Sequence, residues 1–96
     1  MKVFVSDRAK RDLLAIYAYV SRDNPAAAKR IIERISSRLD QLARFPFIGR
    51  ERSSLAPGLR GLIAGNHLIF YIVAADQITV VRVIDSRMDI DEEFRR

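Results

Sequence analysis

The sequence predicts an α+β fold in which a helix hairpin packs on one face of a largely antiparallel sheet. Two long segments place apolar residues at helical steps of three and four. Three later segments are short, apolar and separated by turn residues, and one more strand-like segment precedes the helices. Because the helices bury a stripe each and the sheet buries a face, the hairpin must cover the sheet. The predicted element order is β-α-α-β-β-β.

The N-terminal half contains one predicted strand and two predicted helices. Residues 2–5 form a short strand, and Ser6 is a suitable N-cap for a helix that ends near Arg22. An Asn-Pro pair at 24–25 begins a second helix, which ends before Pro46. The short connection makes the helices an antiparallel hairpin. Their predicted apolar stripes are Ala9, Leu13, Ile16, Tyr17 and Val20 in the first helix, and Ala28, Ile31, Ile32, Ile35, Leu39 and Leu42 in the second.

The C-terminal half is predicted to be mainly β-structure. Residues 45–58 form a loop that contains two prolines and two glycines. The predicted strands span residues 59–64, 67–73 and 77–84. Tight turns join them into an antiparallel meander, whose edge the N-terminal strand can join. The middle strand is nearly all apolar, so we expect both its faces to be covered. Residues 85–96 are polar and charged, with one helical turn around 91–94.

The composition limits the class of protein. The chain has 96 residues, of which 49% are apolar, and residues 1–96 are expected to form a single domain. With no cysteine, disulfides, thiolate zinc sites and cysteine nucleophiles are excluded. The longest apolar stretch, residues 68–75, is far shorter than the roughly 20 residues of a membrane span. The first residues lack a signal-peptide layout, so we expect a cytoplasmic protein without a membrane partner.

Arginine dominates the charge of this chain. The formal net charge is +5, and 14 of the 17 basic residues are arginine, whose planar fork suits carboxylates and phosphates. The charge therefore indicates an acidic partner, protein or nucleic acid, or else a solvated surface. For the stripe formed by Arg30, Arg34 and Arg38 we favour a solvated face. Arg82 interrupts a valine-rich strand, so it needs a partner or an open surface.

Residues typical of catalysis are sparse. A single histidine, His67, cannot build a zinc site alone, and we interpret it as an ordinary strand-end residue. There is no glycine-rich phosphate loop and no nucleophile-elbow motif. The acidic cluster at residues 89–93 is interpreted as a solvated helix start rather than a cation site. No catalytic residue, metal site or cofactor is predicted, which favours a protein that works by binding macromolecules.

Six segments, in this order and spacing, resemble the ParE branch of the RelE/ParE toxin superfamily. They are Ala9-x-x-Asp12-Leu13-x-x-Ile16, Asn24-Pro25-x-Ala27-Ala28, Leu42-x-x-Phe45-Pro46-x-x-Gly49-Arg50, Pro57-Gly58-Leu59-Arg60, Leu68-Ile69-Phe70-Tyr71 and Val80-Val81-Arg82-Val83. Each motif alone is weakly specific, but the ordered set spans nearly the whole chain. The family's layout also agrees with the β-α-α-β-β-β order derived from the pattern.

The resemblance implies the toxin of a bacterial type II toxin–antitoxin pair. Such a toxin would inhibit DNA gyrase by binding, and a ParD-like antitoxin would neutralise it in a hetero-oligomeric complex. Contact with DNA would then be indirect, through the antitoxin. An amphipathic antitoxin segment could fold into an apolar groove that the two helices leave at the sheet edge. No cofactor is implied.

RelE-like relatives cut mRNA instead, so the residues of that nuclease must be compared. The resemblance places the lysines of the RelE nuclease in the segment 61–64, but this segment contains no lysine. An arginine expected from the same comparison is replaced by Leu68. The tyrosine of that nuclease falls on Phe94, and only Arg87 is retained. The implied protein is therefore not an enzyme. The chain also differs from the ParE pattern at two positions. Asp85 replaces a histidine of that pattern, and Met88 separates Arg87 from the aspartate that would follow it directly.

Six residues are candidates for contact with the target or the antitoxin: Arg60, Tyr71, Arg82, Asp85, Arg87 and Phe94. Two alternatives stay open beside gyrase inhibition. One is a ribosome-dependent endoribonuclease that uses Arg60, Arg82 and Arg87. The other is a weak or inactive toxin that acts in repression of its own operon.

Overall fold

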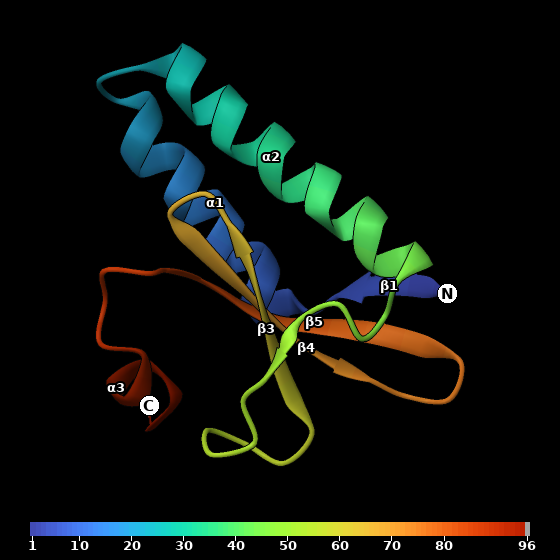
Figure 1. Ribbon diagram of the computed structural model, residues 1–96. Coiled ribbons are helices and arrows are strands. Elements are labelled where there is room, and N and C mark those ends of the chain that lie inside the picture. The colour runs from blue at the N-terminus through green and yellow to red at the C-terminus, as the bar shows by residue number, and fades with distance from the viewer. Residues whose placement is uncertain (96) are drawn as a thin grey trace.

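The computed structural model describes residues 1–95 and confirms the predicted order of elements (Figure 1). The elements are β1 (Lys2–Val5), α1 (Asp7–Ser21), α2 (Pro25–Arg44), β2 (Arg50–Glu51), β3 (Leu59–Ala64), β4 (His67–Val73), β5 (Gln77–Asp85) and α3 (Ile90–Arg95). The strand β2 was not predicted, since two residues inside a loop give no periodic signal. The predicted helical turn near the C-terminus is the short helix α3.

Local capping explains where the two long helices begin. The Ser6 hydroxyl accepts a hydrogen bond from the Ala9 N–H at 3.1 Å, which satisfies a free donor in the first turn of α1. The Asn24 side chain accepts from the Ala27 N–H at 3.0 Å, and Pro25 occupies the first turn of α2. Both predicted caps are confirmed.

The sheet has the strand order β1-β5-β4-β3-β2, so β4 is its middle strand. Strands β2 to β5 are antiparallel neighbours, whereas β1 runs parallel to β5. The α1–α2 hairpin connects β1 to the meander and lies along one face of the sheet (Figure 1). Within residues 1–95, no helix combines the length and apolar character needed to cross a membrane.

Both faces of the sheet are packed. The main core lies between the sheet and the helix hairpin and contains Ile35, Leu42, Ile69 and Tyr71, all at most 2% exposed. The opposite face holds a smaller cluster around Phe70, covered by residues of α3 and of the segment before β3. The predicted stripe of α1 needs one correction. Tyr17 is 45% exposed, because only the side of α1 that carries Ile16 faces the core.

A β-bulge in β5 determines where its side chains point. Phe70 pairs with Arg82 but Tyr71 pairs with Val80, so Val81 is an extra residue in β5. Because of this extra residue, Val80 and Val83 both join the core under the helices. β1 pairs with β5 only as far as Val80. Beyond that point β5 borders the helix α1 instead of a strand.

Candidate binding surfaces

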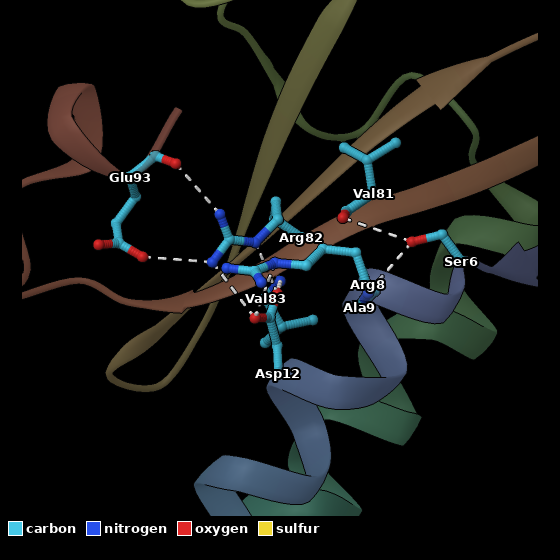
Figure 2. Close-up of polar contacts among 8 residues, drawn as sticks. All are labelled: Ser6, Arg8, Ala9, Asp12, Val81, Arg82, Val83 and Glu93. Carbon is cyan, nitrogen blue, oxygen red and sulfur yellow. Dashed lines mark hydrogen bonds and ion pairs between the residues drawn. The ribbon is translucent and has the colours of Figure 1, made fainter. Parts of the chain in front are cut away.

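Arg82 forms a buried ionic network at the edge of β5 that borders α1 (Figure 2). Its Nε and Nη2 atoms donate to the Asp12 carboxylate of α1 at 2.8 and 3.2 Å. Its Nη2 also donates to the Glu93 carboxylate of α3 at 3.2 Å, and its Nη1 donates to the Glu93 carbonyl oxygen at 3.2 Å. The three side chains are only 9–12% exposed. Arg82 therefore joins β5, α1 and α3.

Asp12 also completes the hydrogen bonding of the β5 edge, because its carboxylate accepts from the Val83 N–H at 2.9 Å. The hydrogen bond to Asp12 is the largest cause that raises the pKa of Arg82 above its usual value. Of the two alternatives for Arg82, a partner or an open surface, the structure shows a partner, and both carboxylates come from the same chain. Glu93 is buried too, so the acidic cluster of residues 89–93 is not wholly solvated.

Tyr71 and Arg60 hold the segment that leads from α2 to β2. The Gly49 N–H donates to the Tyr71 hydroxyl at 2.8 Å, and Arg60 Nη1 donates to the Gly49 carbonyl oxygen at 2.8 Å. Burial raises the pKa of Tyr71. Tyr71 is 0% exposed, so its predicted contact with a partner is wrong. Its hydroxyl instead accepts the hydrogen bond from the loop residue Gly49. Arg60 is half-buried, and its guanidinium lies 5.0 Å from the centre of the Phe47 ring.

Phe94 lies on the face of the sheet opposite the helix hairpin. Its ring meets the Phe70 ring edge to face, with 4.9 Å between the ring centres. It is partly buried and packs α3 against the sheet. Phe94 therefore already contacts Phe70 within the same chain. A partner could contact only the part of its ring that stays exposed.

An apolar groove of about 490 Å³ lies between the end of α1 and the end of β5. It is lined by Ala15, Ile16, Tyr19, Val20, Ile31, Asn66, His67, Asp85, Arg87 and Met88. Tyr19 is 73% and Met88 49% exposed at this groove. The position agrees with the groove expected where two helices leave part of the sheet uncovered. A smaller hollow of about 230 Å³ shares Ala15, Asp85 and Met88 with it and continues to Arg82 and Glu93.

Two of the six predicted contact residues, Asp85 and Arg87, line this groove together. The Asp85 carboxylate accepts from Arg87 Nε at 3.0 Å and from Nη2 at 2.6 Å, and also from the Arg87 backbone N–H at 2.9 Å. The Arg87 side chain is 79% exposed, whereas that of Asp85 is 24% exposed. Arg87 is therefore the predicted contact residue that presents most of its charge to solvent.

The Asp85 carboxyl is expected to titrate well below an ordinary aspartate. The hydrogen bond from the Arg87 side chain is the largest cause that lowers its pKa to about 2. Because the Asp85 pKa is lower in the folded state than in the unfolded state, the ionised carboxylate stabilises the fold at any pH above about 4. This contribution is lost as the pH falls from about 4 to about 2. Because Arg87 is mostly exposed, solvent screening keeps the contribution small.

Carboxyl NMR titration checks this expectation. In Arg87→Ala, the Asp85 pKa should rise toward the ordinary aspartate value, and acid unfolding between pH 4 and 2 should lose part of its steepness. Arg95→Ala, which removes an exposed arginine of α3, is the control and should leave the Asp85 pKa unchanged. An Asp85 pKa near 4 in the unmodified chain would contradict the geometry of this ion pair.

The remaining polar candidates have structural positions. His67 is 6% exposed, and burial is the largest cause that lowers its pKa, although the nearby Asp85 acts in the opposite direction. Arg38 donates to the Ile63 carbonyl oxygen at 2.8 Å. Arg34 lies against the turn at Gly65, where an added Cβ would strike its guanidinium. The interpretation of this arginine stripe as a solvated face agrees with the exposed Arg30 and Arg34, whereas Arg38 is half-buried and bonded to β3. Among residues 1–95, no cluster of three potential ligands could hold a metal ion.

Sequence patterns missed two of these residues. The sequence indicates Asp12 only as part of a family motif, although a carboxylate beside the apolar stripe of a helix is a signal for a buried partner. Gly49 was interpreted as a turn residue. Its role depends on the Tyr71 hydroxyl, 22 residues away in the sequence, and no local pattern indicates that contact.

The arrangement of these elements is found in a solved structure. The chain has a TM-score of 0.75 and 26% identity with a chain of the chromosomal ParDE TA system from P. aeruginosa, covering 88% of this chain and 95% of that chain. The fold is thus that of a small α+β protein similar to a chain of a toxin–antitoxin system.

Sequence comparison gives the family. A family model described as "ParE toxin of type II toxin-antitoxin system, parDE" matches residues 3–90. The chain is 40% identical over 68 residues to Toxin ParE1 of Mycobacterium tuberculosis, which covers 70% of this chain and 69% of that toxin. It is 31% identical over 80 residues to Toxin ParE3 of Caulobacter vibrioides, covering 82% and 80%. It is 33% identical over 76 residues to Toxin RelE2 of the same organism, covering 79% and 84%. This chain belongs to the ParE toxin family of type II toxin–antitoxin systems.

Proposed function

We propose that this toxin arrests bacterial growth by binding DNA gyrase, without catalysing a reaction of its own. The observation that carries this proposal is the match to the ParE toxin family over residues 3–90. The proposal is also supported by the side chains that occupy the positions of the RelE nuclease residues. Leu62 and Leu68 are apolar and Phe94 has no hydroxyl, so none of the three can transfer a proton or stabilise a phosphate charge. The site of action in this proposal is the cytoplasm.

Purified toxin and gyrase test the proposal directly. We expect the toxin to inhibit supercoiling of plasmid DNA and to increase the amount of cleaved DNA that remains bound to gyrase. The second candidate function is a ribosome-dependent endoribonuclease, which the similarity to Toxin RelE2 favours. Cleaved mRNA on purified ribosomes, together with unchanged supercoiling, would replace the first proposal by the second. Strong induction without growth arrest would instead indicate a weak toxin that acts in repression of its operon.

The groove at the end of α1 is the proposed site for the antitoxin. Ile16, Val20 and Ile31 give it an apolar lining, which suits the apolar face of an amphipathic segment. Arg87, 79% exposed, lies at the same groove and can pair with a carboxylate of that segment. A ParD-like antitoxin whose binding segment is disordered when free would order as it fills the groove.

Two tyrosines of one helix provide a matched test of the antitoxin site. Tyr19 lines the groove and is 73% exposed, whereas Tyr17 is 45% exposed and does not line it. Tyr19→Ala should weaken binding of the cognate antitoxin about 30-fold, the effect of losing one aromatic hot-spot residue. Tyr17→Ala should change the affinity by less than about threefold. Calorimetric titration measures both, and equal losses in the two variants would contradict this placement of the antitoxin.

A further inference from the structure

The loop between α2 and β2 exposes three large apolar side chains within four residues of sequence. Phe45 is 59% exposed, Phe47 64% and Ile48 43%. Single exposed apolar residues are common, but a cluster of aromatic and aliphatic side chains on one loop marks an interaction surface. We call residues 45–48 the aromatic loop.

The aromatic loop is held in place by its neighbours. The Ile48 N–H donates to the Phe45 carbonyl oxygen at 3.1 Å, which closes a tight turn. The Gly49 N–H is fixed by the buried Tyr71 hydroxyl, and the Gly49 carbonyl oxygen is fixed by Arg60. The rings are thus presented to solvent from a fixed backbone. A preordered loop loses little conformational entropy on binding, which is the property of a docking surface.

Arginines surround the aromatic loop. Residues 44–60 contain four arginines and a single acidic residue, Glu51, so this segment supplies +3 of the formal net charge of +5. Arg44 and Arg50 are exposed at the two ends of the loop, and the Arg44 guanidinium lies 6.0 Å from the centre of the Phe45 ring. Exposed aromatic residues inside an arginine rim have the composition of a protein interface core.

We infer that the aromatic loop is a second interface, which docks into an apolar pocket rimmed by carboxylates on the protein target of the toxin. This inference rests on the proposed function. Its occupant is a protein rather than a nucleic acid strand, because Ile48 cannot stack on a base and Arg60 already covers one side of the Phe47 ring. A second copy of this chain is disfavoured, since a two-fold interface would bring the arginine rims together.

The aromatic loop lies apart from the groove proposed for the antitoxin. Ile31 lines the groove near the start of α2, and Arg44 is the last residue of the same helix. Thirteen helical steps of 1.5 Å place these two residues about 20 Å apart along the axis. The two surfaces are therefore separable by mutation, and target binding should respond to different residues than antitoxin binding.

The test is the double variant Phe45→Ala/Phe47→Ala, with Phe4→Ala as the matched control. Phe4 is 50% exposed but lies on β1, outside the aromatic loop. We expect the double variant to keep its melting temperature and its affinity for the cognate antitoxin, and to bind purified gyrase at least about 30-fold more weakly. Induced in cells, it should no longer arrest growth. Phe4→Ala should remain as toxic as the unmodified chain.

Charge reversal provides a second variant at the rim. Arg44→Glu should weaken target binding and reduce its dependence on salt, whereas Arg30→Glu, on the same helix but far from the loop, should not. A double alanine variant that binds gyrase and arrests growth like Phe4→Ala would overturn the inference. So would binding of single-stranded DNA, or formation of a dimer, that these two alanine substitutions abolish.

The cell assay separates this inference from the proposed function. If the unmodified chain arrests growth but does not bind gyrase, the gyrase proposal fails, and the growth-arrest comparison still decides whether the aromatic loop is the target surface. If the unmodified chain causes no growth arrest at all, both are overturned.

Discussion

Replacing Asp12 by alanine is expected to destabilise this toxin by about 3 kcal/mol, because it leaves a buried charge without its main partner. Asp12 accepts hydrogen bonds from two guanidinium nitrogens of Arg82 and from the Val83 N–H. In Asp12→Ala the backbone donor is left unsatisfied and the guanidinium keeps only Glu93. For a chain of this length the melting temperature should fall by roughly 15 °C, measurable by calorimetry or circular dichroism.

Two further variants separate the buried pair from a surface effect. Arg8 reaches the same carboxylate at 3.8 Å from a side chain that is 50% exposed, so Arg8→Ala should cost less than about 0.5 kcal/mol. The double variant Asp12→Ala/Arg82→Ala should lose much less than the sum of its single variants, because both partners are removed together. A loss in Asp12→Ala no larger than that in Arg8→Ala would show that the network does not stabilise the fold.

Replacing Gly49 by alanine is the second change with a large expected effect, again about 3 kcal/mol of lost stability. An added Cβ at this position would lie 2.5 Å from the Tyr71 hydroxyl oxygen and 2.7 Å from a carbon of its ring. Tyr71 is fully buried between the sheet and the helices, so its ring cannot swing away. The loop must then move, and the hydrogen bond between Gly49 and Tyr71 breaks. Urea denaturation measures the loss.

A second glycine provides the control for this prediction. Gly58 has a φ of 74° and no atom within 4 Å of an added Cβ, so Gly58→Ala should cost only about 1 kcal/mol for the left-handed backbone. In Tyr71→Phe the nearest clashing atom is absent, so Gly49→Ala should cost less in that background. Equal losses for Gly49→Ala and Gly58→Ala would contradict the close approach. Since Gly49 directly follows the aromatic loop and anchors its backbone, its substitution should also reduce growth arrest.

Most secondary structure could be predicted because its signals are local. Ser6 and Asn24 cap the helices through contacts three residues away, and such contacts can be recognised in the sequence itself. The three strands of the meander were predicted because turns separate short apolar runs. β2 was missed because its two residues are defined by pairing with β3 and not by their own pattern.

The predicted contact residues differ in whether their polar atoms face solvent or the interior of the protein. Arg87 is exposed at a groove beside Asp85, as a contact residue should be. Arg82 interrupts an apolar strand and Tyr71 belongs to a family motif, and both use their polar atoms inside the molecule. The strand pattern indicated that Arg82 needed a partner or an open surface, but it gave no means of telling an internal partner from an external one.

The sequence by itself determined the order of the elements, the capping of the helices, the meander and the resemblance to ParE toxins, since each depends on residues close in the chain or on an ordered set of motifs. The tertiary structure alone decided what the polar residues do. Arg82 meets a carboxylate 70 residues away, and the β-bulge at Val81 sets the direction of that contact. The physical reason is that pairing and burial depend on which distant elements become neighbours, and that neighbourhood exists only once helices and sheet have packed together.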